Sequence, residues 1–338
     1  MVPYFCGALA TRALFVRENL MNIVLTGSVA FDCLMTFPGL FREQILPDKL
    51  DSLSLSFLVD TMVRHRGGIA GNIAYTLALL GERPRLMATV GKDFGEYRAA
   101  LHSVGVDTTL TKEIPDCYTG SFFVTTDRSG CQLASFYPGA MGNAAELSLQ
   151  GVTPRPDWVV ISPNDPAAML KYARECRKLG LALMYDPSQQ AARMDGSEIA
   201  EGLDGCRILI CNEYEFSLIA KKTGRTPDQI ESAVPVVIVT LGEKGSRIKA
   251  GAKTFEIPVV PPRVIADPTG VGDAFRGGLL TGIAHDAPWK ICGRLGALAA
   301  TYCLEEVGTQ NHHFTRAEFL ARYTETFGKD PLAEIILT

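Results

Sequence analysis

The chain has 338 residues, and 33 Lys and Arg stand against 37 Asp and Glu, which gives a formal net charge of −4. Hydrophobic residues make up 47% of the chain, so it can bury a core and is not expected to be disordered. The acidic balance argues against a nucleic-acid binder that works by bulk electrostatics. No apolar run reaches the roughly 18 residues of a membrane-spanning helix.

Cysteine and histidine usage points to an intracellular protein without a metal centre built on these residues. Nine cysteines include no CxxC pair, which predicts reduced, mostly buried thiols in the cytoplasm. The five histidines do not pair with cysteines at zinc spacing. We expect His312 and His313 to lie in a solvated loop.

The first twenty residues differ from the rest of the chain. They are mildly apolar, and Arg12 and Arg17 lie inside and after the apolar stretch, where a signal peptide would carry its positive charge first. A strand-like pattern begins at Met21, which we take as the candidate working start. We therefore expect residues 1–20 to be an extension outside the domain, and residues 21–330 to form one domain.

Strand and helix patterns then alternate along the chain. Strands are predicted at 22–28, 85–90, 157–161, 181–185, 207–211 and 236–241, and helices at 69–80, 94–104, 166–179, 213–222, 272–284 and 289–305. Such alternation indicates βαβ units and a mostly parallel sheet. The run 236–239 is apolar at every position, as expected of a parallel strand buried on both faces.

Two stretches break this alternation. Residues 34–66 show no helix or strand rhythm, and residues 121–137 resemble two short strands around the turn 127–130. Together they predict a small sheet that projects from the main domain as a lid over a site, with segments of about 31–66 and 117–140. The alternative is a pair of ordinary surface hairpins.

The most informative motif is DPTGVGDAF at 267–275, a turn that enters an apolar helix. Gly270 and Gly272 let the backbone approach a ligand, and the exposed amides at a helix N-terminus favour an anion. Asp273 stands beside this anion site, where a carboxylate would repel a phosphate. It therefore suggests a general base that takes a proton from an attacking hydroxyl. The alternative is an aspartate that only caps the helix.

Three further clusters are weaker on their own. The segment 66–72 offers Gly68 for close approach to a substrate and Asn72 as donor and acceptor. The segment 240–245 suits either a loop beside nucleotide phosphates or a plain hairpin. Asn212 and Glu215 lie on one helix face and suit either water around Mg²⁺ or a helix cap.

The sequence motifs of several other enzyme families are absent. The chain has no P-loop, no GxGxxG after the first strand, no GxSxG elbow and no protein-kinase motif set. The four clusters in their order instead resemble the ribokinase-like (PfkB-type) family of sugar and nucleoside kinases, over about residues 21–327. Its C-terminal signature usually runs D-T-x-G-A-G-D, from which Pro268 and Val271 depart mildly.

This resemblance implies a three-layer α/β/α domain with a mostly parallel central sheet and a small β-sheet lid. It also implies Asp273 as general base, with the amides of Gly270, Val271 and Gly272 as an anion hole. The implied ATP-binding residues are Asn212, Thr240, Gly242, Gly245, Gly270 and Gly272. Glu215 would hold Mg²⁺ through water, and K⁺ is a further candidate ion.

Within the family, the stretches at 26–32, 54–60, 65–72, 134–141 and 186–190 are most similar to bacterial adenosine kinases. The similarity implies ATP-dependent phosphorylation of the 5′-hydroxyl of adenosine to AMP, as in purine salvage. The acceptor site would comprise Ser28, Asp32, Ser56, Gly68, Asn72, Phe122 and Phe136. The two phenylalanines would come from the lid and stack on the base, and Asp32 would accept from two vicinal hydroxyls.

Other functions stay open at this point. The acceptor could be ribose, another sugar, inosine or guanosine. A nucleoside sensor without catalysis is disfavoured because Asp273, Asn212 and Glu215 are intact, and a nicotinamide oxidoreductase lacks its fingerprint. The resemblance further implies a homodimer formed through the lid, with adenosine and ATP as ligands and neither nucleic acid nor membrane as a partner.

Overall fold

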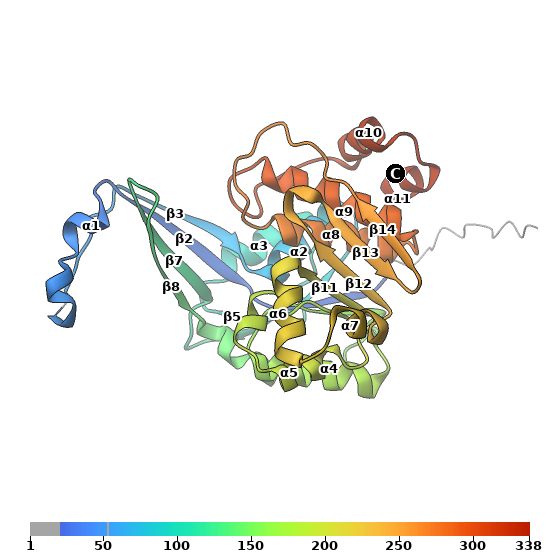
Figure 1. Ribbon diagram of the computed structural model, residues 1–338, viewed down its shortest axis with the longest axis horizontal. Helices are drawn as coiled ribbons and strands as arrows, with labels where there is room; N and C mark the ends of the chain where they lie inside the picture. Colours follow the sequence, from blue (N-terminus) through green and yellow to red (C-terminus); the bar gives the residue numbers. More distant parts are fainter. Residues whose placement is uncertain (1–20, 53) are drawn as a thin grey trace, which may run out of the picture.

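The computed structural model describes residues 21–52 and 54–338, so the expectation for residues 1–20 lies outside its described part. A layered α/β body carries a long, thin projection on one side, which extends well beyond the body (Figure 1). Within the described residues, no helix is both long and apolar enough to cross a membrane.

The body is built around an eight-stranded sheet in the order β14-β13-β12-β11-β10-β9-β1-β4. Its strands are β1 (Ile23–Thr26), β4 (Arg85–Met87), β9 (Trp158–Ile161), β10 (Ala182–Tyr185), β11 (Ile208–Asn212), β12 (Val236–Thr240), β13 (Ser246–Ala250) and β14 (Lys253–Ile257). Neighbours from β4 to β12 are parallel, and β13 and β14 extend that edge in antiparallel pairing. The predicted mostly parallel sheet is confirmed.

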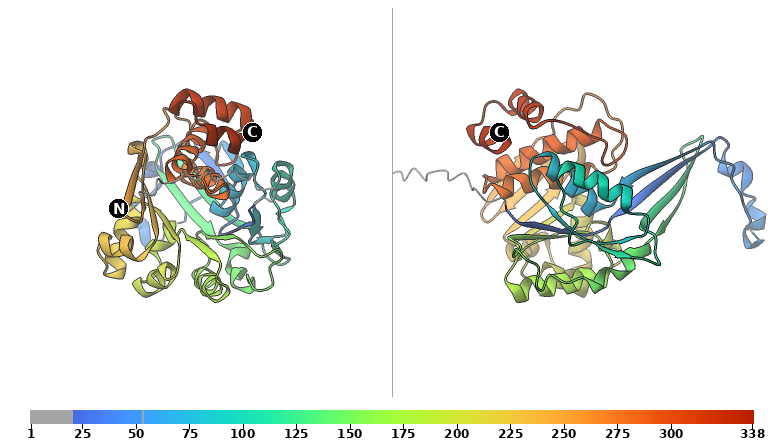
Figure 2. Two further views of the ribbon diagram at one scale, coloured as in Figure 1. Left: turned by 90° about the vertical axis from the view of Figure 1, so that its right-hand side faces the viewer. Right: turned by 180° about the vertical axis from the view of Figure 1, so that it is seen from behind.

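Helices cover both faces of this sheet (Figure 1 and Figure 2). One layer contains α2 (Ile69–Leu79), α3 (Gly95–Val104), α8 (Val271–Ala284), α9 (Trp289–Leu304), α10 (Arg316–Phe327) and α11 (Pro331–Leu337). The other contains α4 (Pro166–Leu179), α5 (Gly196–Leu203), α6 (Glu213–Thr223) and α7 (Pro227–Ala233). Because side chains alternate along a strand, Ile208 and Ile210 of β11 enter the first core and Leu209 and Cys211 enter the second.

The projection is a four-stranded sheet in the order β3-β2-β7-β8, and we call it the lid. Its strands are β2 (Ala30–Phe37), β3 (Thr61–Gly67), β7 (Gly120–Asp127) and β8 (Gln132–Tyr137). Between β2 and β3, the short helix α1 (Phe41–Gln44) and a 3₁₀ segment (Pro47–Ser52) lie at the far end of the lid (Figure 2). The predicted small sheet is therefore present, with two strands from each irregular stretch.

Two local expectations are wrong, and a third segment follows one of the two alternatives left open for it. The strand predicted at 85–90 is two strands, because after β4 the chain leaves the main sheet and β5 (Thr89–Gly91) pairs with β6 (Lys112–Ile114). The segment 240–245 is a hairpin, as in the plainer of its two interpretations: 3₁₀ residues Gly242–Lys244 connect β12 to antiparallel β13. His312 is not solvated but buried, with Nε2 3.0 Å from the Thr76 hydroxyl.

Candidate active site

A cavity of about 590 Å³ opens between the lid and the carboxyl ends of the parallel strands. Ligands of open α/β sheets bind outside this edge of the sheet, because the strand ends and the loops after them converge there. Twelve predicted site residues line the cavity: Ser28, Asp32, Gly68, Asn72, Phe122, Phe136, Asn212, Glu215, Thr240, Gly270, Gly272 and Asp273. Residues that are far apart in sequence are thus gathered around one space.

The N-terminus of α8 forms one wall. Gly270 precedes the helix with φ of 78°, a left-handed conformation that L side chains rarely adopt. A Cβ on Gly270 would also lie only 2.8 Å from the Cβ of Thr309. Glycine is therefore required here for two reasons, and it leaves the first amides of α8 free to face an anion.

Asp273 lies in the first turn of α8 and faces the cavity. Its Oδ2 accepts a hydrogen bond of 2.8 Å from Nδ2 of Asn72 on α2. Burial raises the pKa of Asp273 to about 7, against the opposing effects of Arg276 and of the Asn72 hydrogen bond. A carboxyl group that titrates near neutral pH is suited to taking up a proton during a reaction.

Beside it runs a buried ion pair that sequence reasoning missed. Arg276, one turn further along α8, donates from Nη2 to Oδ1 of Asp186 at 2.6 Å and from Nη1 to the Gly272 carbonyl at 2.9 Å. Asp186 follows β10 and is fully buried. The pair fixes the first turn of α8 against the end of β10, and Arg276 also lines the cavity.

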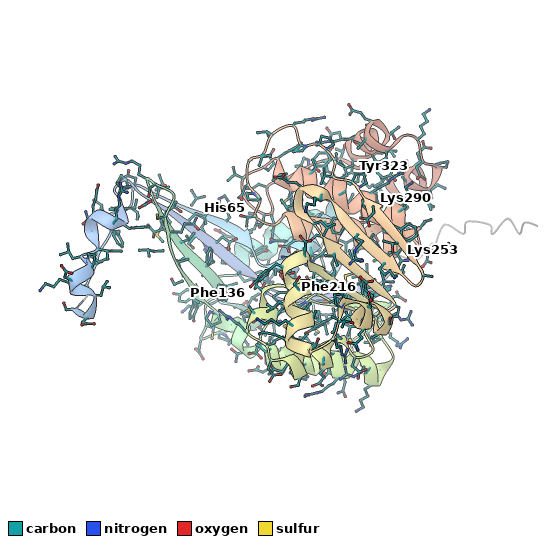
Figure 3. The ribbon with its side chains drawn as sticks, in the orientation of Figure 1. His65, Phe136, Phe216, Lys253, Lys290 and Tyr323 are labelled. Atoms are coloured by element: carbon teal, nitrogen blue, oxygen red, sulfur yellow. The ribbon has the colours of Figure 1, made fainter. Side chains whose placement is uncertain are left out.

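The lid supplies the opposite wall. Register places His65, Asp32, Phe122 and Phe136 in one row across its four strands, so their side chains share the lid face that bears the cavity. Figure 3 shows His65 and Phe136 on this sheet. Burial raises the pKa of Asp32 to about 6, and the charge of His65 partly opposes this. Gly67 lacks a side chain where Asp32 packs against it.

Asn212 and Glu215 form a reciprocal cap at the start of α6. The side chain of Asn212 accepts from the Glu215 amide at 2.8 Å, and Oε2 of Glu215 accepts from the Asn212 amide at 2.8 Å. The second oxygen, Oε1, lies 3.4 Å from the Ser188 hydroxyl, and Glu215 and Ser188 both line the cavity. The helix-cap interpretation is therefore correct as far as it goes, and one carboxylate oxygen remains for a ligand.

The sequence matches the model of pfkB family carbohydrate kinases over residues 29–315. The chain belongs to the PfkB family of carbohydrate kinases. A nucleoside kinase of Burkholderia thailandensis, solved in complex with inosine, is 36% identical, with a TM-score of 0.81 over 91% of this chain and 98% of that one. The nucleoside kinase of Methanocaldococcus jannaschii is 25% identical, with a TM-score of 0.81 over 90% and 99%. The nucleoside kinase of Methanothermobacter thermautotrophicus is 28% identical over 92% of this chain and 98% of its own.

Membership in the PfkB family makes the chain a kinase with a ribokinase-like fold. Four of its predicted site residues do not line the cavity. Ser56 is exposed in the stretch between the 3₁₀ segment and β3. Val271 lies in the first turn of α8, where only its amide suits the proposed anion hole. Gly242 and Gly245 flank the turn between β12 and β13, beside the cavity residue Thr240.

Other cavity residues of this PfkB chain were missed by sequence reasoning. They are Arg276 and Thr309 near Asp273, and Gln189, Gln190 and Arg193 from the loop after β10. The segment 186–190 stands out only through the family resemblance, because a loop rich in Ser and Gln has no periodicity. Oε1 of the buried Gln190 has no hydrogen-bond partner in the structure and could accept from a ligand.

Magnesium is the ion that kinases of this kind would use with ATP. In the described part of the chain, no three His, Cys, Asp or Glu side chains gather to hold a metal ion. Mg²⁺ is commonly held by one or two carboxylates together with waters and substrate phosphates. Glu215 fits that role, because its pKa is raised mainly by burial and further by Asp186, so a cation beside it would be favoured.

Proposed function

We propose that this chain transfers the γ-phosphoryl group of ATP to the 5′-hydroxyl of a nucleoside, with Asp273 as the general base. The observation that carries the proposal is the position of Asp273: its carboxylate faces the cavity from the amide-rich start of α8. A hydroxyl placed between Asp273 and a phosphate on those amides could lose its proton and attack in line.

Residues at one end of the cavity would bind the ATP phosphates, and residues at the other end would bind the acceptor. Amides at Gly270, Val271 and Gly272 would stabilise the charge that develops on the transferred phosphoryl group. Asn212, Thr240, Gly242 and Gly245 would border the ATP phosphates. Glu215 would hold Mg²⁺ through water, and the ion supplies positive charge that offsets the charge of the phosphates.

At the acceptor end, Asp32, Gly68 and Asn72 would bind the ribose hydroxyls, with Ser28 beside them. The aromatic side chains of Phe122 and Phe136 would contact the base, which a free sugar lacks. We retain adenosine as the first acceptor to test. Inosine stands beside it, because the relative from Burkholderia thailandensis was solved with inosine and with ADP-inosine. Ser56 remains a proposed contact only if the lid closes further.

An acceptor panel tests the reaction directly. ADP release from Mg-ATP is measured with adenosine, inosine, guanosine, cytidine and ribose, each in potassium and in sodium buffer. We expect a nucleoside to give a kcat/KM at least tenfold above that of ribose. A higher kcat/KM for ribose would overturn the nucleoside assignment, and equal rates in both buffers would argue against a K⁺ requirement.

The role of Asp273 is tested by Asp273→Asn, which keeps the shape and removes the base. We expect turnover to fall by about two to four orders of magnitude, because general base catalysis typically contributes that much. Nucleoside binding, measured by calorimetry, should change little. Near-normal turnover in this variant would sink the assignment.

We further infer that two copies associate through the lid and that the protein works in the cytoplasm. The support for association is a set of exposed apolar side chains on and beside the lid, including Leu46, Leu50, Leu58 and Met62. Apolar side chains gathered in this way are typical of an interaction surface.

A further inference from the structure

A chain of buried polar groups leads from the base of the lid to Asp273. Oη of Tyr97, on α3, donates to the Gly67 carbonyl at 2.8 Å, where β3 ends. The same oxygen accepts from Nε2 of Gln310, in the loop after α9. Nε2 of Gln310 also donates to Oδ1 of Asn72 at 2.8 Å, and Asn72 donates to Asp273.

The side chains that form this row of hydrogen bonds are buried almost completely. Tyr97 is fully buried, and Asn72 and Gln310 are 4% and 3% exposed. Gly71 leaves room for the tyrosine hydroxyl, because a Cβ at that position would collide with it. Polar groups removed from water in this way are costly unless they are hydrogen-bonded, so the bonds made by Nε2 of Gln310 favour one arrangement, with Oε1 of Gln310 left without a partner.

The donors and acceptors fix the direction of the Asn72 amide. The two hydrogens of Gln310 Nε2 are directed at Tyr97 and at Asn72, so the group facing Gln310 must be the oxygen of Asn72. Its NH₂ group is then left to face Asp273. A flipped Asn72 would set donor against donor at Gln310 and acceptor against acceptor at an ionised Asp273.

Thr309 adds a second restraint on the same oxygen. Its hydroxyl lies 2.8 Å from Oδ1 of Asn72 and 2.9 Å from the Arg66 carbonyl. One hydroxyl proton can serve only one of these acceptors at a time. Gln310 is therefore the member that can donate to Asn72 continuously.

We propose that Gln310 is a positioning residue that keeps Asn72 turned to donate to the ionised carboxylate of Asp273, and that Tyr97 anchors Gln310 to the base of the lid. This inference rests on the proposed role of Asp273 as general base. It adds Gln310, which lies 238 positions from Asn72 along the chain and reaches Asp273 through the Asn72 side chain.

Other charges also face Asp273 and have to be considered in any pH experiment. Arg276 on the same helix lowers its pKa, whereas Asp186 after β10 and Asp32 on the lid raise it. None of them is altered when Gln310 is replaced. A change in the titration of Asp273 in such a variant would therefore come through Asn72.

The experiment compares Gln310→Met with His312→Asn. Methionine matches the length of glutamine without donors, and His312 is a buried residue of the same loop that bonds Thr76 instead. The acid limb of the pH profile of kcat/KM for the acceptor reports the pKa of the essential base in the free enzyme. We expect Gln310→Met to shift this limb upward by about half to one pH unit, because the hydrogen bond to the carboxylate is no longer held.

At pH 6.5 the activity of Gln310→Met should therefore be about three- to tenfold below wild type, and at pH 9 it should approach wild type. His312→Asn should lower the melting temperature without moving the limb. A uniform loss at every pH in Gln310→Met would show a merely structural role and overturn the inference.

A second variant covers the case in which Gln310→Met does not fold. Tyr97→Phe removes one hydroxyl, so Gln310 keeps Asn72 but loses its anchor, and we expect a smaller shift in the same direction. No shift in Tyr97→Phe would then count against the inference. If Asp273→Asn retains turnover, the proposed function itself fails. If Asp273→Asn is inactive while the limb stays in place, only the positioning role fails.

Discussion

At the scale of single residues, the proposed role of Asp273 as general base comes with a cost to the stability of the folded state. Burial raises its pKa to about 7, so the proposed base would be ionised only as pH rises through about 7. In the unfolded chain, the Asp273 carboxyl has the ordinary aspartate pKa of about 3.9. Between these values the folded state binds more protons than the unfolded state, so the contribution of Asp273 to stability falls as pH rises from about 4 to 7.

Asp273→Asn should therefore be more stable than wild type at high pH, although we expect it to lose turnover. We expect its melting temperature to exceed that of wild type by about 2–5 °C at pH 8, because the buried charge is removed. The difference should shrink towards pH 5, where wild-type Asp273 is protonated. Differential scanning calorimetry at the two pH values measures this, and a constant difference would contradict it.

The sequence indicated Asp273 because a carboxylate beside glycines at a helix start is chemically unusual. It could not indicate Arg276 and Asp186 as partners, because they are 90 positions apart and meet only once β10 and α8 are packed. Thr309 and Gln310 were missed for the same reason. Side chains that act through other side chains leave no local pattern.

At the scale of elements, six helices and the buried parallel strands were predictable because their periodicity is strong, whereas α5, α7, α10 and α11 were missed. Residues 236–239 of β12 are all apolar and are buried in the two cores in alternation. The lid strand from residues 34–66 was not predictable in this way, whereas two short strands were expected within 121–137. β3 is exposed over its first four residues, so it carries no alternation that marks a buried face.

The start of α8 gives an element-scale prediction. Gly270→Ala would strain a residue at φ of 78° and set a methyl against Thr309, so the first amides of the helix would shift. We expect a loss of about 1–3 kcal/mol of unfolding free energy. Activity should fall at least tenfold.

Gly95→Ala is the matched control, because Gly95 begins α3, has no neighbour within 4 Å of its Cβ position and needs no positive φ. Its stability should stay the same or rise slightly, since alanine favours helices. Urea unfolding and steady-state assays compare the two variants. Equal effects of the two substitutions would refute the special requirement for glycine at position 270.

The lid face gives a second prediction at this scale. Phe136 and Phe123 are 41% and 39% exposed, but they lie on opposite faces of the lid. Phe136→Ala should raise KM for a nucleoside about tenfold, because a base-stacking contact of roughly 1–3 kcal/mol is lost. Phe123→Ala should leave KM unchanged. Similar KM values in the two variants would show that the lid does not contact the base.

At the scale of the whole molecule, the body and the lid follow different rules. The body closes two cores around one sheet and leaves the cavity at its edge. The lid is a single sheet, so its second face and its far end cannot be covered by the body (Figure 2). Composition predicted a chain able to bury a large core, but it could not show that apolar residues such as Leu58 and Met62 would be left outside it.

The side chains of Leu58 and Met62 are 86% and 66% exposed. Large apolar side chains that are exposed together are unusual on a monomer and indicate an interaction surface. A second copy packed on the lid would remove them from water. We expect sedimentation velocity at micromolar concentration to show a dimer, and Leu58→Glu with Met62→Glu to convert it to a monomer. Ile335→Glu is the control, because Ile335 is also exposed but belongs to α11, which lies on the side of the body away from the lid (Figure 1). A wild-type monomer, or equal dissociation by the control, would show that the apolar lid surface does not hold two copies together.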